Sequence, residues 1–224
     1  MERTDRNLVE SKDWFRFSAN FLPLKRFLAI GGYTMKVLNS KERLSRLSRM
    51  QNVEAKFTIA NSDAFRRSAL ALGFRRAGVL LQRDTFFRVP NGKLKLREEG
   101  SRAMLISYAR HPTGSLKSSD YTLVPISDPA GLKAALASSL GVFGEVTKRR
   151  VLFLRRNIRL HIDRVDGLGT FGEFEAVVGG RNPPAKCRRE VEELLGKLGV
   201  KLADLIDVSY MDMIVRRKER SWNL

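Results

Sequence analysis

The chain has 224 residues, 43% of them hydrophobic and 29% charged, which is enough for one well-filled globular domain with a tail. Its single cysteine, Cys187, excludes an intramolecular disulfide and fits a reducing compartment, and the lack of a Cys/His ligand array argues against structural zinc. The net charge of +18 calls for an anionic partner, either nucleic acid or a polyanionic small molecule. No apolar run approaches the roughly 20 residues that cross a bilayer, so we expect no membrane partner.

The first 49 residues are basic, with eleven Lys and Arg against five Asp and Glu. Charges interrupt their short apolar stretch at residues 27–30, which argues against a secretory signal, and the acidic residues argue against a mitochondrial transit peptide. We therefore expect a cytoplasmic protein, with a mitochondrial location as the alternative. We interpret residues 1–49 as a basic extension that is either disordered or not native, with Met35 and Met50 as alternative start sites of translation. A short basic helix at residues 40–49 is a further alternative.

The rest of the chain alternates between period-two segments and short helical segments. We expect strands near residues 52–57, 78–89, 93–98, 102–110, 118–125, 144–154, 157–164 and 171–178, a loop at 111–115, and helices near 62–72, 129–140, 182–198 and 201–206. Asn61 and Asp128 are suited to cap the first two helices, and Gly73 and Gly141 to end them. Asn91-Gly92 is a tight hairpin signal between two strands.

The last predicted hairpin has the most informative pattern. Arg159, His161 and Asp163 fall on one face of its first strand, and apolar residues fall on the other face. Glu173 and Glu175 repeat this pattern in its second strand. Two carboxylates two residues apart suit a hard divalent cation, and nearby arginines suit phosphate.

Three other predicted strands also alternate charged and apolar residues, at 52–57, 93–97 and 148–152. In an ordinary sheet these charged faces would point to solvent. A closed barrel with a charged interior would explain all of them together. We therefore predict an α+β fold, in which a closed eight-stranded antiparallel β-barrel forms a tunnel and helices pack outside it.

Seven segments carry short motifs in a characteristic order. Asn52, Glu54 and Lys56 correspond to the pattern E-x-E-x-K, residues 82–87 to Q-x-D-x-Y-F, and residues 92–98 to L-K-L-R-E. Residues 105–110 correspond to L-I-x-Y-x-R, and residues 117–121 to K-x-S-D-Y. Residues 159–175 correspond to R-I-H-L-D-x-V-x-x-L-G-x-F-x-E-x-E, and residues 205–212 contain the closing S-Y-x-D. The series resembles the CYTH family of class IV adenylyl cyclases, thiamine triphosphatases and other triphosphate tunnel enzymes. The resemblance implies a CYTH domain at residues 50–214, followed by a basic C-terminal tail at 215–224.

The resemblance also implies a divalent cation, Mg²⁺ or Mn²⁺, held by acidic side chains. We expect Glu54, Glu173 and Glu175 to be the metal ligands, with Asp163 as a further acid on the neighbouring strand. Asn52 departs from the family pattern, because it replaces the first Glu of the opening motif. The loss of this carboxylate is expected to weaken a second metal site or to leave the metals more bound by water.

The basic residues of the motifs are the expected triphosphate ligands: Lys95, Arg97, Arg110, Lys148, Arg150 and Arg159. We assign Lys56, His161 and Asp163 to catalysis. His161 has two interpretations, a proton carrier near neutral pH or a side chain that orients Asp163 or contacts substrate. For each basic residue the alternative is a solvated side chain, and for each acid it is charge balance for a neighbouring arginine.

The expected function is metal-dependent hydrolysis of an organic or inorganic triphosphate, with ATP, thiamine triphosphate and tripolyphosphate as candidate substrates. The first alternative is an adenylyl cyclase that makes cyclic AMP and pyrophosphate from ATP. The second is an inactive module that binds polyphosphate or nucleic acid. Nucleic acid stays open because six arginines look peripheral: Arg66, Arg67, Arg188, Arg189, Arg216 and Arg217. A homodimer also stays open.

Overall fold

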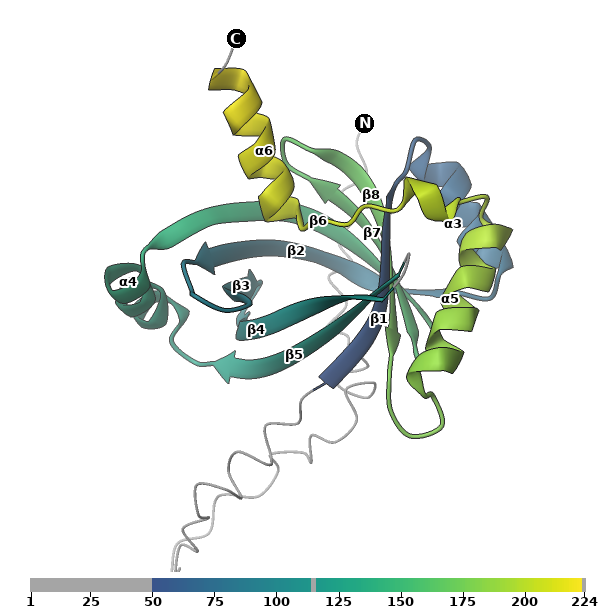
Figure 1. The fold of residues 1–224 in the computed structure, drawn as a ribbon, viewed down its shortest axis with the longest axis horizontal. Coiled ribbons are helices and arrows are strands. Elements are labelled where there is room, and N and C mark those ends of the chain that lie inside the picture. The colour runs from purple at the N-terminus through teal and green to yellow at the C-terminus, as the bar shows by residue number, and fades with distance from the viewer. Residues whose placement is uncertain (1–49, 114–115, 223–224) are drawn as a thin grey trace, which may run out of the picture. The chain divides into compact units, whose positions relative to one another are not determined.

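The computed structural model describes residues 50–113 and 116–222 (Figure 1), so the expected extension at 1–49 and its helix lie outside the described residues. The strands are β1 (Met50–Thr58), β2 (Arg75–Phe87), β3 (Lys93–Glu99), β4 (Arg102–Thr113), β5 (Leu116–Ile126), β6 (Val142–Arg155), β7 (Ile158–Val165) and β8 (Gly169–Val177). The helices are α3 (Ser62–Ala71), α4 (Pro129–Leu140), α5 (Pro184–Lys197), the 3₁₀ turn η1 (Leu202–Asp204) and α6 (Tyr210–Trp222).

The eight strands close into one antiparallel barrel in the order β1-β5-β4-β3-β2-β6-β7-β8. β1 closes it, because Glu54 is paired in register with Lys117 of β5 on one side and with Glu175 of β8 on the other. This arrangement confirms the predicted fold class.

The main hydrophobic core lies outside the barrel, between its wall and α3 and α5 (Figure 1). The outward face of β1 contributes Val53 and Phe57, and α5 covers it with Val191, Leu194 and Leu195. A second cluster lies under α4, which packs on β2 and β3. Because successive side chains of a strand point to opposite faces, packing the apolar residues outward directs the charged residues inward.

The predicted helix boundaries follow local backbone chemistry. The side chain of Asn61 accepts hydrogen bonds from two backbone N–H groups of α3, and Asp128 accepts one from Gly131 at the start of α4. Gly141 ends α4 with a φ of 76°, a left-handed value that glycine adopts without a steric penalty. None of the described helices is both long and apolar enough to cross a membrane.

Two local predictions were wrong. β4 continues through residues 111–113, which pair with β5 down to Leu116, so this segment is strand where a loop was expected. The helix expected at 201–206 is only the 3₁₀ turn η1.

The sequence pattern also missed α6, and the expected domain end at residue 214 falls inside this helix. The partly or fully buried side chains Met211, Ile214 and Val215 belong to a hydrophobic cluster with Val146 of β6. A Cβ atom on Gly144 would lie only 2.4 Å from the terminal methyl carbon of Met211, so this glycine permits the close approach of α6 to β6.

Candidate active site inside the barrel

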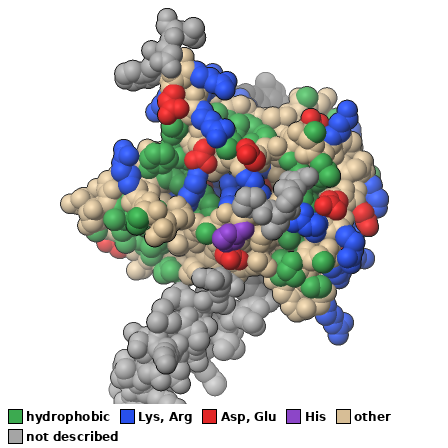
Figure 2. Space-filling model, in the orientation of Figure 1, with side chains coloured by type: hydrophobic (Ala, Val, Ile, Leu, Met, Phe, Trp, Pro, Cys, Tyr) green, Lys and Arg blue, Asp and Glu red, His purple; other side chains and the backbone are tan. Residues whose placement is uncertain are grey.

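The structure brings all twelve predicted site residues to the inner face of the barrel. One carboxylate that we had not assigned, Asp84, joins them there. Together they form a network of ion pairs inside the barrel with seven cationic and five acidic members among the described residues: Lys56, Lys95, Arg97, Arg110, Lys148, Arg150 and Arg159 with Glu54, Asp84, Asp163, Glu173 and Glu175. Figure 2 shows Lys and Arg side chains gathered with acidic ones in a hollow on one face of the molecule.

His161, Glu173 and Glu175 form a compact group on β7 and β8, where His161 is paired in register with Glu173. One ligand atom from each lies within 4.8 Å of the others. Nδ1 of His161 is 3.6 Å from one carboxylate oxygen of each glutamate. This nitrogen is buried and has no hydrogen-bond partner among the described residues. A buried, unpartnered imidazole nitrogen between two carboxylates provides donor atoms that suit a divalent cation.

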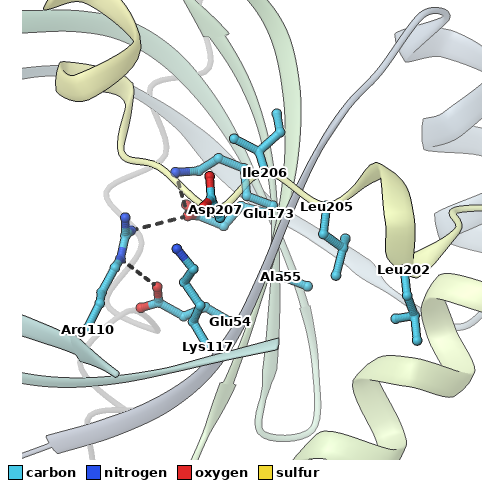
Figure 3. A pocket seen from close by; sticks show the side chains of 10 residues that line it. Glu54, Ala55, Arg110, Lys117, Glu173, Leu202, Leu205, Ile206 and Asp207 are labelled. Carbon is cyan, nitrogen blue, oxygen red and sulfur yellow. Dashed lines mark ion pairs between the residues drawn. The ribbon is translucent and has the colours of Figure 1, made fainter. Parts of the chain in front are cut away.

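Glu54 lies beside this group on β1, and Arg110 of β4 links it to Glu173 (Figure 3). Nε of Arg110 is 3.3 Å from Glu54 and its Nη2 is 4.0 Å from Glu173. Burial raises the pKa of Glu54 to about 7, although the guanidinium of Arg110 opposes this rise. Burial also raises the pKa of Glu173, but Lys56, His161 and Arg150 more than offset this, so its pKa lies well below the usual value. Of these two acids, Glu54 is therefore the one that binds a proton more readily.

Asp163 is held by two neighbours deep in the barrel. Arg150 donates two hydrogen bonds to its carboxylate, at 2.7 and 2.6 Å, and the hydroxyl of Tyr210 donates a third at 3.0 Å. Burial would raise the pKa of Asp163, but Arg150 outweighs it and leaves this pKa below the usual value. Asp163 is therefore an ionised anchor for Arg150 rather than an exposed base.

Asp84 of β2 is surrounded by three cations. Lys95 and Lys148 each donate a hydrogen bond of 2.9 Å, and Arg97 donates two at 2.7 and 2.8 Å. Burial would raise the pKa of Asp84, but Arg97, Lys148 and Lys95 together hold it well below the usual value. Burial lowers the pKa of Lys95 to about 7 and that of Lys148 to about 8. The carboxylate of Asp84 thus holds three cationic side chains together, and their combined positive charge exceeds its single negative charge.

The sequence contained a signal for Asp84, since this residue occupies the acidic position of the Q-x-D-x-Y-F motif. Its partners could not be identified from that motif, because they come from β3 and β6, up to 64 residues away.

The chain after η1 also contributes to the site, which we had not predicted. The N–H of Ile206 donates to the carbonyl of Lys56 at 2.7 Å, and the ammonium of Lys56 donates to the carbonyl of Val208 at 3.3 Å. The ring of Tyr210 lies 4.2 Å from Nζ of Lys56 and 5.7 Å from Nζ of Lys148. Tyr210 therefore contacts both Lys56, which pairs with Glu173, and Lys148, which pairs with Asp84. The closing S-Y-x-D motif was the sequence signal that could have identified this tyrosine as part of the site.

Asn52 faces the interior and accepts a hydrogen bond of 3.3 Å from the hydroxyl of Tyr121. The two neighbouring side chains on β7 and β8, Arg159 and Glu175, form an ion pair of 3.3 Å. The position that departs from the family motif is thus buried and satisfied, and it supplies a neutral oxygen where a carboxylate would add a charge.

The six arginines expected at the periphery lie outside this interior. Five are exposed, and Arg188, which is half-buried, forms an ion pair of 3.8 Å with Glu192 on α5. Nucleic-acid binding by this surface and formation of a homodimer both stay predictions.

The family model for the CYTH domain matches residues 50–210. The chain belongs to the CYTH family. This family acts on triphosphate substrates such as ATP, and the matched range contains every residue of the charged interior described above.

Three proteins illustrate the relationship. A Methanocaldococcus jannaschii protein named "Putative adenylate cyclase" is 26% identical over 175 residues, which cover 73% of this chain and 98% of the relative. The solved structure of the PH1012 protein from Pyrococcus horikoshii is 21% identical, with a TM-score of 0.65, and the match covers 72% of this chain and 98% of that one. A Hippeastrum protein, described as an adenylyl cyclase candidate with a dominant triphosphatase activity, is 16% identical, with a TM-score of 0.52 and coverage of 72% and 93%. The two structures share the fold of this CYTH protein.

Proposed function

We propose that this CYTH protein is a divalent-metal-dependent triphosphatase whose active site is the charged interior of the barrel. The observation that carries the proposal is the group formed by His161, Glu173 and Glu175, which shares one barrel interior with seven cations. Four of these cations pair with Glu173 or Glu175, namely Lys56, Arg110, Arg150 and Arg159, and the other three surround Asp84. Cations alone would suffice to bind an anion. Carboxylates add nothing to anion binding, whereas Glu173 and Glu175 beside His161 offer donor atoms that suit a divalent cation.

In this proposal Glu173 and Glu175 hold Mg²⁺ or Mn²⁺ with help from Glu54 and His161. The metal would neutralise phosphate oxygens and lower the pKa of a bound water. Arg110 and Arg159 border the acidic group and are placed to bind phosphate oxygens on this side. Lys95, Arg97 and Lys148 would bind the triphosphate on the side of Asp84.

Hydrolysis forms a bond from a water oxygen to the terminal phosphorus and breaks the bond from that phosphorus to its bridging oxygen. The bridging oxygen leaves on the diphosphate, and the water proton passes to a basic group of the site. Lys56 is the candidate for moving a proton or for stabilising charge, because it lies 3.5 Å from Glu173 and burial lowers its pKa. Asp163 positions Arg150 and Tyr210 in this scheme.

The second candidate function is an adenylyl cyclase, which the name of the M. jannaschii relative favours. Cyclisation requires in addition that the ribose 3′ oxygen be held at the α-phosphorus. Among the described residues we assign none to that task, whereas phosphate binding and water activation both have candidates. Hydrolysis is therefore the function that the geometry supports best.

The test is product analysis with the full-length chain and Mg²⁺ or Mn²⁺. ATP, thiamine triphosphate and tripolyphosphate are supplied separately, and phosphate, pyrophosphate and cyclic AMP are resolved. The proposal predicts phosphate release that requires the metal and is not accompanied by cyclic AMP. Cyclic AMP with stoichiometric pyrophosphate would establish the cyclase instead. No product from any substrate would favour an inactive binding module.

A further inference from the structure

The outer wall of the barrel carries an arginine pair that the interior site does not use. Arg149 of β6 and Arg164 of β7 are both exposed and are paired directly in register. The neighbours of Arg149 on β6, Lys148 and Arg150, are buried in the interior, so Arg149 points outward. Directly opposed side chains have Cβ atoms about 4.5–5.5 Å apart, and like charges in such a pair destabilise a sheet. The pair therefore costs stability unless an anion lies between the two guanidinium groups.

Among the described residues, no acidic side chain neutralises this arginine pair. Neither arginine forms an ion pair or a side-chain hydrogen bond with another described residue, although Lys133 and Glu145 do form an ion pair elsewhere on the outer surface. Asp166 is only two residues from Arg164 in the sequence, and it forms no ion pair with it. The two guanidinium groups are thus available to an anion from solution.

The same face of the sheet continues on β2. Leu81, which is paired with Arg149, is 66% exposed, and Arg83, which is paired with Thr147, is also exposed. Glu98 of β3 is paired with Arg83, so this arginine has one acid beside it. The wall therefore presents three exposed arginines on three adjacent strands, with one exposed apolar side chain among them.

α6 extends the positive charge at the rim of the barrel. Arg217 donates a hydrogen bond to the carbonyl of Gly167, in the turn between β7 and β8 and three residues after Arg164 (Figure 1). Arg220 lies three residues further along α6, on the same face of the helix, and is exposed. We call Leu81, Arg83, Arg149, Arg164, Arg217 and Arg220 the outer arginine patch.

The composition of the outer arginine patch indicates which anion it suits. All of its cations are arginines, whose planar guanidinium group can donate two hydrogen bonds to one phosphate. None of its members is aromatic, so it lacks the side chains on which unpaired bases stack. Its one exposed leucine is too little apolar surface for insertion into a membrane. Such a surface suits backbone phosphates and does not read bases.

We propose that the outer arginine patch binds the phosphate backbone of double-stranded nucleic acid without sequence preference. The patch lies outside the barrel, so this binding goes beyond the proposed triphosphatase function and does not depend on it. The net charge of +18 attracts a polyanion from a distance, and the patch determines where it is bound. Phosphates next to Arg149 and Arg164 also remove the repulsion between these two side chains.

The test compares the double variant Arg149→Gln/Arg164→Gln with the control Arg67→Gln/Arg189→Gln. The control removes the same charge from two exposed arginines on α3 and α5. Fluorescence anisotropy with the full-length chain measures the affinity for short duplexes of DNA and of RNA at several salt concentrations. These duplexes share the phosphate backbone, and the one that is bound more tightly identifies the natural ligand.

The proposal predicts that the patch variant binds the duplex at least about tenfold more weakly than the control at low salt. The slope of log affinity against log salt concentration should be shallower by about two, one for each lost phosphate contact. The melting temperature of the patch variant should equal or exceed that of the wild type, because a pair of like charges is removed. Equal losses of affinity in the two variants, or no binding of either duplex by the wild type, would overturn the proposal.

Three competing ligands are distinguished by further measurements on the same proteins. Displacement of the duplex by tripolyphosphate at equal ionic strength would place the nucleic acid in the barrel and overturn the outer site. Tighter binding of a single strand than of the duplex would contradict the duplex assignment. Binding to phosphatidylserine vesicles that requires Arg149 and Arg164, without duplex binding, would show a membrane surface as the partner instead.

Discussion

Arg150 and Asp163 form a buried two-point ion pair, with hydrogen bonds of 2.7 and 2.6 Å. Nη2 of Arg150, which donates the shorter of these two bonds, also lies 3.0 Å from Glu173, which belongs to the candidate metal group. Arg150 therefore connects a carboxylate that serves as its anchor to one that is proposed to bind metal. The stability of the barrel and the geometry of its acidic group depend on the same side chain.

Replacing Arg150 with Met should destabilise the protein by about 3–5 kcal/mol, because it leaves Asp163 charged and buried without its partner. Chemical denaturation measures this change in the free energy of unfolding. The matched control is Arg188→Met, which removes an arginine from the partly exposed pair with Glu192 and should cost less than about 1 kcal/mol. Similar losses in both variants would show that the buried pair is not a structural anchor.

Replacing Glu175 with Gln should weaken Mn²⁺ binding about 100-fold or more, because a metal ligand is removed from the group with His161 and Glu173. Turnover with tripolyphosphate should fall with metal occupancy. Calorimetric titration with Mn²⁺ measures the affinity, and Glu192→Gln on α5 is the control outside the barrel. If Glu175→Gln binds Mn²⁺ as tightly as the control does, the metal group is wrongly assigned.

The affinity for Mn²⁺ should rise between pH 6 and pH 8. Burial raises the pKa of Glu54 to about 7, so below that pH a proton competes with the metal for its carboxylate. The same shift means that the folded state binds this proton more tightly than the unfolded state does, so without metal Glu54 costs stability as the pH rises from its usual pKa toward 7. Glu54→Gln should flatten both profiles. A variant that keeps the wild-type pH dependence would place the titrating group elsewhere.

Tripolyphosphate binding should weaken as the pH rises from 6 to 9. Burial lowers the pKa of Lys95 to about 7 and that of Lys148 to about 8, so the free site loses positive charge over this range. Lys95→Arg should retain more affinity at pH 9 than the wild type does, because arginine stays charged. Competition binding at several pH values measures the difference. Identical pH profiles for the two proteins would exclude Lys95 from the triphosphate site.

Much of the fold could be predicted because the period-two pattern is strong in this sequence. Charged residues at alternate positions of β1, β3, β6, β7 and β8 indicated inward faces, and the structure confirms them. The closed barrel could be inferred only because it explains why so many charged strand faces point inward. It depends on the pairing of β1 with both β5 and β8, whose contacts are distant in sequence.

The remaining features depend on tertiary contacts that no local pattern encodes. Asp84 gains its role only when β2 lies between β3 and β6, which bring its three cations together. The position of α6 depends on such a contact as well, because its apolar residues Met211, Ile214 and Val215 pack on β6 only where Gly144 leaves room for Met211. Ile206 and Tyr210 reach the site because the chain returns to β1 about 150 residues after leaving it.

A crystal structure of the full-length protein with tripolyphosphate and Mn²⁺ tests the central claim most directly. We predict an anomalous Mn²⁺ signal next to Glu173, Glu175 and His161, and phosphate oxygens within hydrogen-bond distance of Arg110 and Lys95 inside the barrel. Tripolyphosphate bound only on the outer surface, with no Mn²⁺ signal at the carboxylates, would contradict the account.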